Sequence, residues 1–516
     1  MANFISTNLI SSRSELNKTH LRIFVVAILA LALVVPQANS FDIKDFENKI
    51  VERTLENGLR IIVLERRDAP VASLVTYANV GSSDDPKGFT GMAHVFEHMA
   101  FKGDQEIGTN NYAKEKIAIE AEEEAFLAWR SERNKGSLAD SVKLVNLEKT
   151  FRSAQDECDQ YVVTNELGNI IEREGFVNLN AFTSMDQTCY LYNFPQNKLE
   201  LAIMLEAARF SNPVLREYHK EVDVVKEERR MRIESSGIGK LIEEWLSASF
   251  KAHPYGISGV GHMSDLGNYS REEATAFFKK YYVPNNLCLI VVGDVNAKDV
   301  FKFAEKYFGD LPKGDPIELI HTVEPEQLGE RRVVVEDPAQ PFWLVGYHVP
   351  NSQHADKPAL DALVDYLGNG RTSLLYKKLV KETKKAVNVG ALTGFPGNKY
   401  PGMAAVYAVN AKDVSNAEVE ELVLGEIEKL KEAPLPEEEM EKIRARAKAS
   451  FINQLESRVG MAIQLGSYEM IAGDWRELFR ELDRINSVTG DDIQRVAKKY
   501  FTRKNRTIAV IETVDS

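Results

Sequence analysis

The sequence predicts an α+β protein of two domains with similar folds, each a sheet with helices packed on one face. The main observation is an internal repeat. Residues 279–286 end a charged helical segment and lead into the apolar run 287–292, and the same pattern recurs at residues 498–505 and 506–511. A helix, a turn and a strand that occur once in each half indicate two related domains. A length of 516 residues also exceeds what one compact core usually holds.

Proline and glycine residues between 311 and 325 interrupt the periodic pattern and separate the two domains. We expect an N-terminal domain at residues 41–315 and a C-terminal domain at residues 330–516. The first domain contains an insertion at residues 104–175 that is rich in Glu, Ala, Lys and Leu and predicts a long helical hairpin. Such a hairpin can serve as an interaction arm, a lid or a spacer, or it is only a solvated pair of surface helices.

Residues 1–40 have the pattern of an export signal. Arg13, Lys18 and Arg22 precede an apolar run at residues 23–35, and small residues that suit a signal peptidase follow it. This run is short for a membrane span. We expect the segment to be removed during export to the periplasm or the exterior, which leaves a mature chain without a membrane span. An uncleaved membrane anchor is the alternative.

Composition excludes several classes of protein. Hydrophobic residues make up 44% and charged residues 27% of the chain, as in ordinary globular proteins. The net charge of -13 makes nucleic acid a poor partner and favours basic peptides as substrates. Cys158, Cys189 and Cys288 are an odd number without close spacing, so we expect buried free cysteines and no cysteine-based metal site.

The residues that indicate chemistry are concentrated at 91–103. His94 and His98 are four residues apart and project from the same face of a helix. A catalytic zinc site has three protein ligands and one position open for water, and these histidines supply two of the three. Glu97 lies beside them and can accept a proton from that water, so the predicted reaction is hydrolysis. The alternative is a pair of surface histidines on an ordinary amphipathic helix.

The order His-x-x-Glu-His is typical of inverted zincins. Together with residues 55–60 and 80–83, the segment resembles the family of pitrilysin, insulin-degrading enzyme and mitochondrial processing peptidase. The resemblance implies a zinc metalloendopeptidase that cleaves peptides or small unfolded proteins and holds one zinc ion per chain. It also implies that each domain has a mixed, mainly antiparallel sheet, and that the chain forms half of the clamshell found in longer relatives.

Glu221 and Glu228 are seven residues apart, which places them two turns apart on one helical face. The resemblance implies that Glu228 is the third zinc ligand and that Glu221 is a carboxylate that orients a ligand histidine. Glu227 as the ligand, or a charged helix unrelated to the metal, are the alternatives. This assignment requires the helical insertion to loop out without disturbing the fold.

The resemblance also implies a substrate-binding edge strand at Asn180, Ala181 and Thr183. Substrate backbone adds to such an edge as another strand, and main-chain hydrogen bonds then accept varied sequences. Packing within the sheet is the alternative explanation for each of these side chains.

The later domain departs from the family pattern in one respect. Many active relatives carry an Arg and, seven residues later, a Tyr that steady the substrate, whereas this chain has Val380 and Val387. Arg371 and Tyr376 are possible substitutes at shifted positions. We therefore expect a homodimer or a heterodimer, with a heteromeric partner that supplies the missing pair slightly favoured. The alternative function is a non-catalytic or partner-dependent structural subunit of a peptidase complex.

Overall fold

The computed structural model describes residues 46–515. The export signal predicted at residues 1–40 lies outside the described residues, so the signal and the exported location stay predictions. Within the described part of the chain, no helix is both long and apolar enough to cross a bilayer. Residues 46–49 form a helical turn that belongs to the N-terminal segment, and the body of the protein consists of residues 50–515.

The first sheet has six strands in the order β1-β2-β6-β3-β5-β4. Only β2 and β6 are parallel, and every other neighbouring pair is antiparallel. Strand β4 therefore lies at one edge. The strands are β1 (Ile50–Thr54), β2 (Arg60–Glu65), β3 (Val71–Ala78), β4 (Val177–Thr183), β5 (Thr188–Pro195) and β6 (Leu287–Gly293).

The second sheet repeats this topology with five strands in the order β7-β11-β8-β10-β9. Strands β7 and β11 are parallel and the other pairs are antiparallel, as for β2 and β6 in the first sheet. The prediction of two similar folds with mixed, mainly antiparallel sheets is confirmed. The strands are β7 (Arg331–Asp337), β8 (Phe342–Val349), β9 (Ala386–Phe395), β10 (Gly402–Asn410) and β11 (Arg506–Thr513).

The sequence repeat corresponds to equivalent elements in the two halves. Helix α11 (Arg271–Tyr281) leads into β6, and helix α18 (Gly490–Tyr500) leads into β11. Both helices begin with a capping box, which satisfies backbone N–H groups of the first turn. After each helix an asparagine side chain donates to the carbonyl of the last helical tyrosine at 2.8 Å, from Asn286 in one half and Asn505 in the other.

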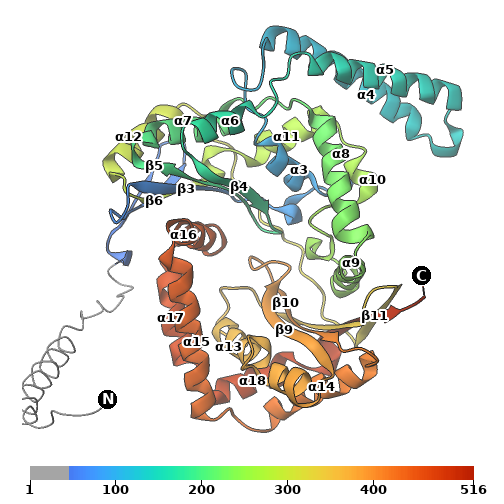
Figure 1. Cartoon of the computed structure of the whole chain (residues 1–516), viewed down its shortest axis with the longest axis vertical. Helices are drawn as coiled ribbons and strands as arrows, with labels where there is room; N and C mark the ends of the chain where they lie inside the picture. The colour runs from blue at the N-terminus through green and yellow to red at the C-terminus, as the bar shows by residue number, and fades with distance from the viewer. Residues whose placement is uncertain (1–45, 516) are drawn as a thin grey trace, which may run out of the picture. The chain divides into compact units, whose positions relative to one another are not determined.

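One face of each sheet is covered by helices from its own half, as the sequence predicts (Figure 1). Apolar side chains of the sheets and helices pack together there and form the two main cores. On the first sheet these helices include α3 (Met92–Met99), α7 (Leu199–Ser211), α11 and α12 (Ala297–Phe308). On the second sheet they are α13 (Lys357–Gly368), α14 (Asn416–Glu432) and α18.

The structure adds a feature that the sequence does not indicate, because a helix from the opposite half covers the second face of each sheet. Helix α9 (Gly237–Ser249) packs on β7 and β11, and helix α16 (Arg458–Ala472) packs on β3 and β6 (Figure 1). Gly466 of α16 permits this contact, since a Cβ there would lie 2.3 Å from the ring of Tyr77. The two sheets therefore belong to one packed body, while the domain boundaries at 315 and 330 stay predictions.

Replacement of Trp245 in α9 tests how much the packing of this helix on the opposite half contributes to stability. Its indole ring is fully buried against the second sheet, and the indole N–H donates to the carbonyl of Thr507 at 3.1 Å. We expect Trp245→Ala to lower the free energy of unfolding by about 3–5 kcal/mol, because it leaves a cavity between the halves. Urea unfolding followed by circular dichroism measures the change. Val323→Ala, at an exposed position, is the control, and equal midpoints for the two variants would contradict a stabilising role for α9.

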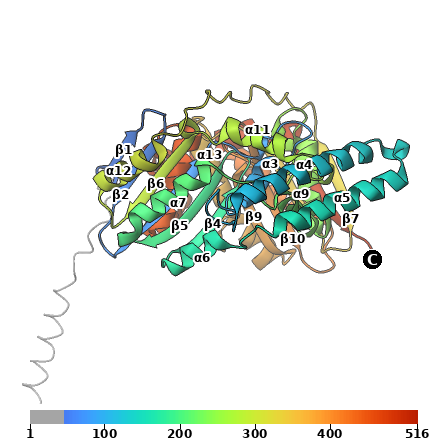
Figure 2. The same ribbon diagram turned by 90° about the horizontal axis from the view of Figure 1, so that it is seen from above.

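A helical hairpin lies within the predicted insertion, and it consists of α4 (Tyr112–Arg133) and α5 (Ser141–Asp159). It projects beside α8 (Tyr218–Arg229) and α11 in Figure 1, and α4 lies beside α11 in Figure 2. Buried ion pairs attach it to the body, including Glu122 with Arg271 at 2.6 Å. The remaining α-helices of residues 46–515 are α6 (Glu166–Arg173), α8 (Tyr218–Arg229), α10 (Met263–Leu266), α15 (Glu437–Glu456) and α17 (Glu477–Ser487).

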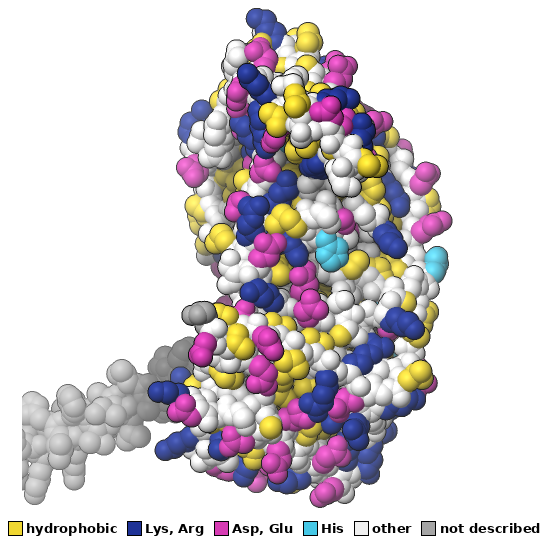
Figure 3. Space-filling view, turned by 90° about the vertical axis from the view of Figure 1, so that its right-hand side faces the viewer, with side chains coloured by type: hydrophobic (Ala, Val, Ile, Leu, Met, Phe, Trp, Pro, Cys, Tyr) yellow, Lys and Arg dark blue, Asp and Glu magenta, His cyan; other side chains and the backbone are white. Residues whose placement is uncertain are grey.

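Charged side chains of both signs are interspersed on the face shown in Figure 3. Ion pairs join many charged side chains of the described residues, as in the contact of Arg130 with Glu273 at 2.7 Å. The excess of acidic residues is therefore not gathered into a single acidic field on this face.

Candidate metal centre

Helix α3 presents the two histidines and Glu97, and its first turn is fixed by contacts that precede it. The carboxylate of Asp85 accepts the backbone N–H groups of Gly91 at 2.7 Å and Ala93 at 2.9 Å. This contact satisfies two N–H groups that a helix start leaves free. Gly91 has a left-handed conformation with φ of 91°, and a Cβ there would lie 2.7 Å from the carbonyl oxygen of Val260. The direction of α3 is thus set before the histidines begin.

Helix α8 brings Glu228 to the two histidines. Its Oε2 atom lies 3.6 Å from Nε2 of His94 and 3.5 Å from Nε2 of His98. Each residue offers one ligand atom, and the three atoms lie within 4.8 Å of one another. Within residues 46–515 these are the only three His, Cys, Asp or Glu side chains that gather in this way. Two helices that are distant in the sequence therefore converge on one point.

This donor set fits zinc. Two imidazole nitrogens and one carboxylate oxygen are ligands that zinc prefers in catalytic sites. Two bonds of about 2.1 Å at a tetrahedral angle leave about 3.4 Å between the donor atoms. The observed separations of 3.6 Å and 3.5 Å between Glu228 and the histidines are close to that value.

Burial keeps the imidazole ring of His94 in its neutral form. Its side chain is buried, and burial lowers the pKa of the imidazole well below its ordinary value. The ring is therefore neutral near pH 7, which is the form that binds a metal ion.

His98 is oriented through its second ring nitrogen. Nδ1 lies 3.3 Å from Oε2 of Glu221, while Nε2 is directed at Glu228. Burial alone would lower the pKa of His98, but the hydrogen bond and the charge of Glu221 outweigh burial and raise this pKa. A carboxylate on the outer nitrogen fixes the tautomer and the direction of the ring, which is the role predicted for Glu221.

Glu228 and Glu227 have different surroundings. The second oxygen of Glu228, Oε1, forms an ion pair with Arg232 at 2.6 Å, and 21% of the side chain is exposed. Glu227 has 66% of its side chain exposed and pairs with Arg230 on the outside of the helix. The structure thus brings Glu228 to the histidines and leaves Glu227 on the surface.

Glu97 lies next to His98 on α3 and is partly buried. Burial raises the pKa of its carboxyl group, while a hydrogen bond from the hydroxyl of Thr183 and the charge of His98 act to lower it. The net shift is upward, so the carboxylate is a stronger base than an exposed glutamate.

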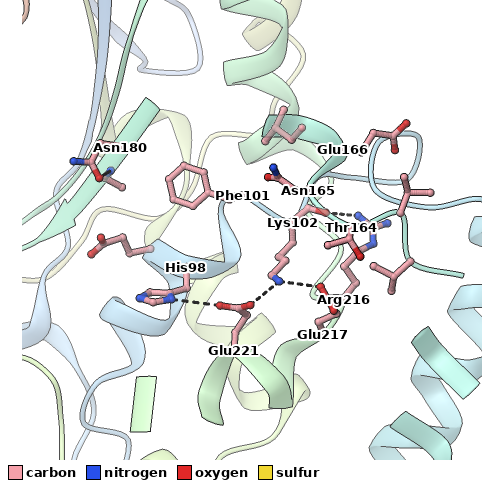
Figure 4. A pocket seen from close by; sticks show the side chains of 15 residues that line it. His98, Phe101, Lys102, Thr164, Asn165, Glu166, Asn180, Arg216, Glu217 and Glu221 are labelled. Atoms are coloured by element: carbon pink, nitrogen blue, oxygen red, sulfur yellow. Dashed lines mark hydrogen bonds and ion pairs between the residues drawn. The ribbon is translucent and has the colours of Figure 1, made fainter. Parts of the chain in front are cut away.

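The predicted substrate strand is β4, which lies at the edge of the first sheet. Edge strands have main-chain groups that no neighbouring strand pairs. Asn180 and Ala181 also line a pocket of about 380 Å³ that Glu97 and His98 reach (Figure 4). Thr183, which also belongs to β4, contacts Glu97 of α3. Strand β4 therefore combines a free edge for a substrate with a contact to the predicted general base.

The positions at which the resemblance implies an Arg and a Tyr are occupied by Val380 and Val387 in this chain. Val380 lies in a π-helical turn at residues 376–382, and Val387 lies exposed on β9. Valine offers no hydrogen-bond donor to a substrate carbonyl.

Sequence reasoning missed three residues that support the site, namely Asp85, Lys102 and Arg232. Arg232 stands four residues after Glu228, and residues at this spacing are neighbours on a helix surface. That spacing was a usable signal. Lys102 and Asp85 had no such signal, because Lys102 lies beyond the end of α3 and the role of Asp85 depends on how the loop before α3 folds back.

Comparison with protein families agrees with this arrangement. A family model described as "Insulinase (Peptidase family M16)" matches residues 60–128, which include both histidines and Glu97. A model described as "Peptidase M16 inactive domain" matches residues 268–447. The chain belongs to the M16 peptidase family. The two matches leave out Glu228, so the geometry alone brings this residue into the M16 site.

Two relatives show how far the similarity of this M16 chain extends. "Zinc protease PqqE" of Helicobacter pylori is 28% identical over 495 residues, which cover 94% of this chain and 97% of the relative. "Mitochondrial-processing peptidase subunit beta" of Lentinula edodes is 21% identical over 484 residues, which cover 90% of each chain. Both matches span both halves of the chain.

Solved structures show the same M16 fold. A protease from Helicobacter pylori superposes with a TM-score of 0.75 at 27% identity, and the match covers 90% of this chain and 99% of that one. The periplasmic protease PqqL from Escherichia coli superposes with a TM-score of 0.66 at 15% identity. That match covers 90% of this chain but 48% of PqqL, so the chain corresponds to about half of the longer protein.

Proposed function

We propose that this protein is a zinc metalloendopeptidase that hydrolyses peptides or small unfolded proteins. The observation that carries the proposal is the convergence of His94, His98 and Glu228, whose ligand atoms lie within 4.8 Å of one another, with Glu97 beside them. The names of the relatives as zinc proteases support zinc as the metal. One zinc ion per chain would be held by these three side chains.

When bound there, zinc supplies a Lewis acid that polarises the scissile carbonyl and makes water a stronger acid. Glu97 moves the proton. A carboxylate oxygen of Glu97 accepts the proton from the attacking water and later gives it to the leaving amine. The raised pKa of Glu97 suits both steps, since the group must hold the proton between them.

Strand β4 supplies the binding surface for the substrate. An extended peptide that pairs with Asn180, Ala181 and Thr183 would run along the edge of the first sheet, beside Glu97. Main-chain pairing requires an extended backbone, so it selects peptides and unfolded segments over folded proteins.

A second candidate is a partner-dependent subunit of a heteromeric complex. Val380 and Val387 provide no hydrogen-bond donors at the positions where the resemblance implies an Arg and a Tyr. The chain also corresponds to about half of PqqL. A partner that supplies Arg and Tyr would complete the site, and one relative is itself named as a peptidase subunit. A homodimer or a heterodimer would each supply the half that this chain lacks relative to PqqL. The absence of the Arg and Tyr side chains favours the heterodimer.

Zinc content and peptidase activity, measured together, test both candidates. We expect the purified chain to hold zinc and to show weak, chelator-sensitive cleavage of an unstructured peptide. Addition of proteins that co-purify should raise the activity by about 10²-fold, which is the effect of one transition-state donor. Full activity of the pure chain would contradict the need for a partner. Absence of zinc and of cleavage under both conditions would contradict the peptidase proposal.

A further inference from the structure

Lys102 connects the two helices that form the metal centre. It follows α3 by one turn, and its ammonium group lies 2.6 Å from Oε1 of Glu221 and 2.9 Å from Oε2 of Glu217 (Figure 4). Only 20% of the Lys102 side chain is exposed. Since the other oxygen of Glu221 faces Nδ1 of His98, a continuous polar chain runs from Glu217 through Lys102 and Glu221 to a ligand histidine.

The main chain of Lys102 is held as firmly as its side chain. The fully buried guanidinium of Arg216 donates to the carbonyl oxygens of Lys102, Asp104 and Ile107. The same guanidinium forms two hydrogen bonds with Glu115 in the first turn of α4, at 2.8 Å and 3.1 Å. Arg216 thus gathers the loop after α3, the start of α8 and the base of the hairpin. Lys102 has little freedom to move away from Glu221.

We propose that Lys102 is a positioning residue of the metal centre, which holds Glu221 on Nδ1 of His98 and thereby directs Nε2 of His98 at the metal. This inference rests on the proposed function. Lys102 would affect zinc binding through Glu221 and would not contact the substrate.

The physical reason is the charge of the two carboxylates. Glu217 is the residue that precedes the first turn of α8, and Glu221 lies in that turn. Both carboxylates approach the same ammonium group of Lys102, and like charges this close repel each other. Lys102 lies between them and offsets both charges. Without Lys102, Glu221 can relieve the repulsion by rotating toward solvent, and His98 then loses the partner that fixes its ring. Outer partners of this kind change metal affinity by about 10–100-fold.

The test is the zinc dissociation constant, measured by competition with a chromogenic chelator. We expect Lys102→Met to weaken zinc binding about 10–100-fold, and we expect Glu221→Ala to weaken it by a similar factor. In the double variant the two changes should not multiply, because both remove the same support. Lys102→Gln, which also lacks the charge, is expected to behave like Lys102→Met and serves if the methionine variant does not fold. Lys102→Arg keeps a charge between the carboxylates and should recover part of the affinity.

Lys357→Met is the matched control. Lys357 has 16% of its side chain exposed and contacts Asp361 at 2.6 Å, but it lies in the second half of the chain. We expect Lys357→Met to bind zinc like the wild type. The melting temperature of each metal-free variant separates loss of the site from loss of the fold.

Three outcomes would overturn the inference. Zinc binding of both Lys102→Met and Lys102→Gln at wild-type affinity would show that Glu221 needs no support. Fold-changes that multiply in the double variant would show that Lys102 acts apart from Glu221. A raised KM with unchanged zinc affinity would make Lys102 a substrate contact. In each case the wild type still binds zinc, whereas a wild type that binds none would contradict the proposed function itself.

Discussion

Glu97→Gln should retain zinc and lower kcat for peptide cleavage by about 10²–10⁴-fold, the usual contribution of a general base. Glutamine has the same size as glutamate and can keep the contact with Thr183, but it cannot accept a proton at neutral pH. His94, His98 and Glu228 are unchanged in this variant, so the ligand set stays complete. Steady-state kinetics and metal analysis of the same preparation measure the two quantities.

Two further variants sharpen this expectation. Glu97→Asp keeps a carboxylate but withdraws it by one methylene, so we expect kcat between those of the wild type and of Glu97→Gln. Glu106→Gln removes an exposed glutamate from the loop after α3 and should leave kcat unchanged. Wild-type cleavage by Glu97→Gln would assign the proton transfer to another group. Loss of zinc in this variant would instead make Glu97 part of the ligand set.

Glu228→Gln is the second change with a large expected effect. It replaces the carboxylate that lies 3.5–3.6 Å from both histidine nitrogens with a neutral amide, a much poorer zinc ligand. We expect the zinc dissociation constant to rise by more than about 100-fold, above the range for an outer partner. Cleavage should fall in parallel with zinc content. Chelator competition and metal analysis measure these effects.

Glu227→Gln is the matched control, because it makes the same chemical change one residue earlier. Glu227 is exposed on α8 and pairs with Arg230, so its loss should leave zinc affinity and activity unchanged. The reverse result, with zinc lost in Glu227→Gln and kept in Glu228→Gln, would move the ligand by one residue and contradict the placement of α8.

Much of the fold could be predicted because it depends on local pattern. The recurrence of residues 279–292 at residues 498–511 indicated two related halves. The first segment forms the end of α11 and most of β6, the second forms the end of α18 and most of β11, and the two strands hold equivalent positions in their sheets. The exchange of α9 and α16 between the sheets had no such signal. An amphipathic helix reveals that it buries one face, but the sequence does not say which sheet receives that face.

The candidate site divides in the same way. The spacing of His94 and His98, with Glu97 between them, follows from the geometry of a single helix, and so does the alignment of Glu221 with Glu228. The meeting of the two helices does not follow from it. That contact depends on the direct packing of α3 against α8 and on the loop that Arg216 and Lys102 hold together.

The sequence by itself determined the residue types of the site, their periodicity along each helix and the presence of two related halves. Helical geometry fixes these relations over a few residues, whatever the remainder of the chain does. Tertiary structure alone decided that Glu228 faces the histidines while Glu227 faces solvent, that Lys102 bridges α3 and α8, and that each sheet is covered by a helix from the other half. Contacts between segments far apart in sequence depend on how all their surfaces pack, and short patterns do not encode them.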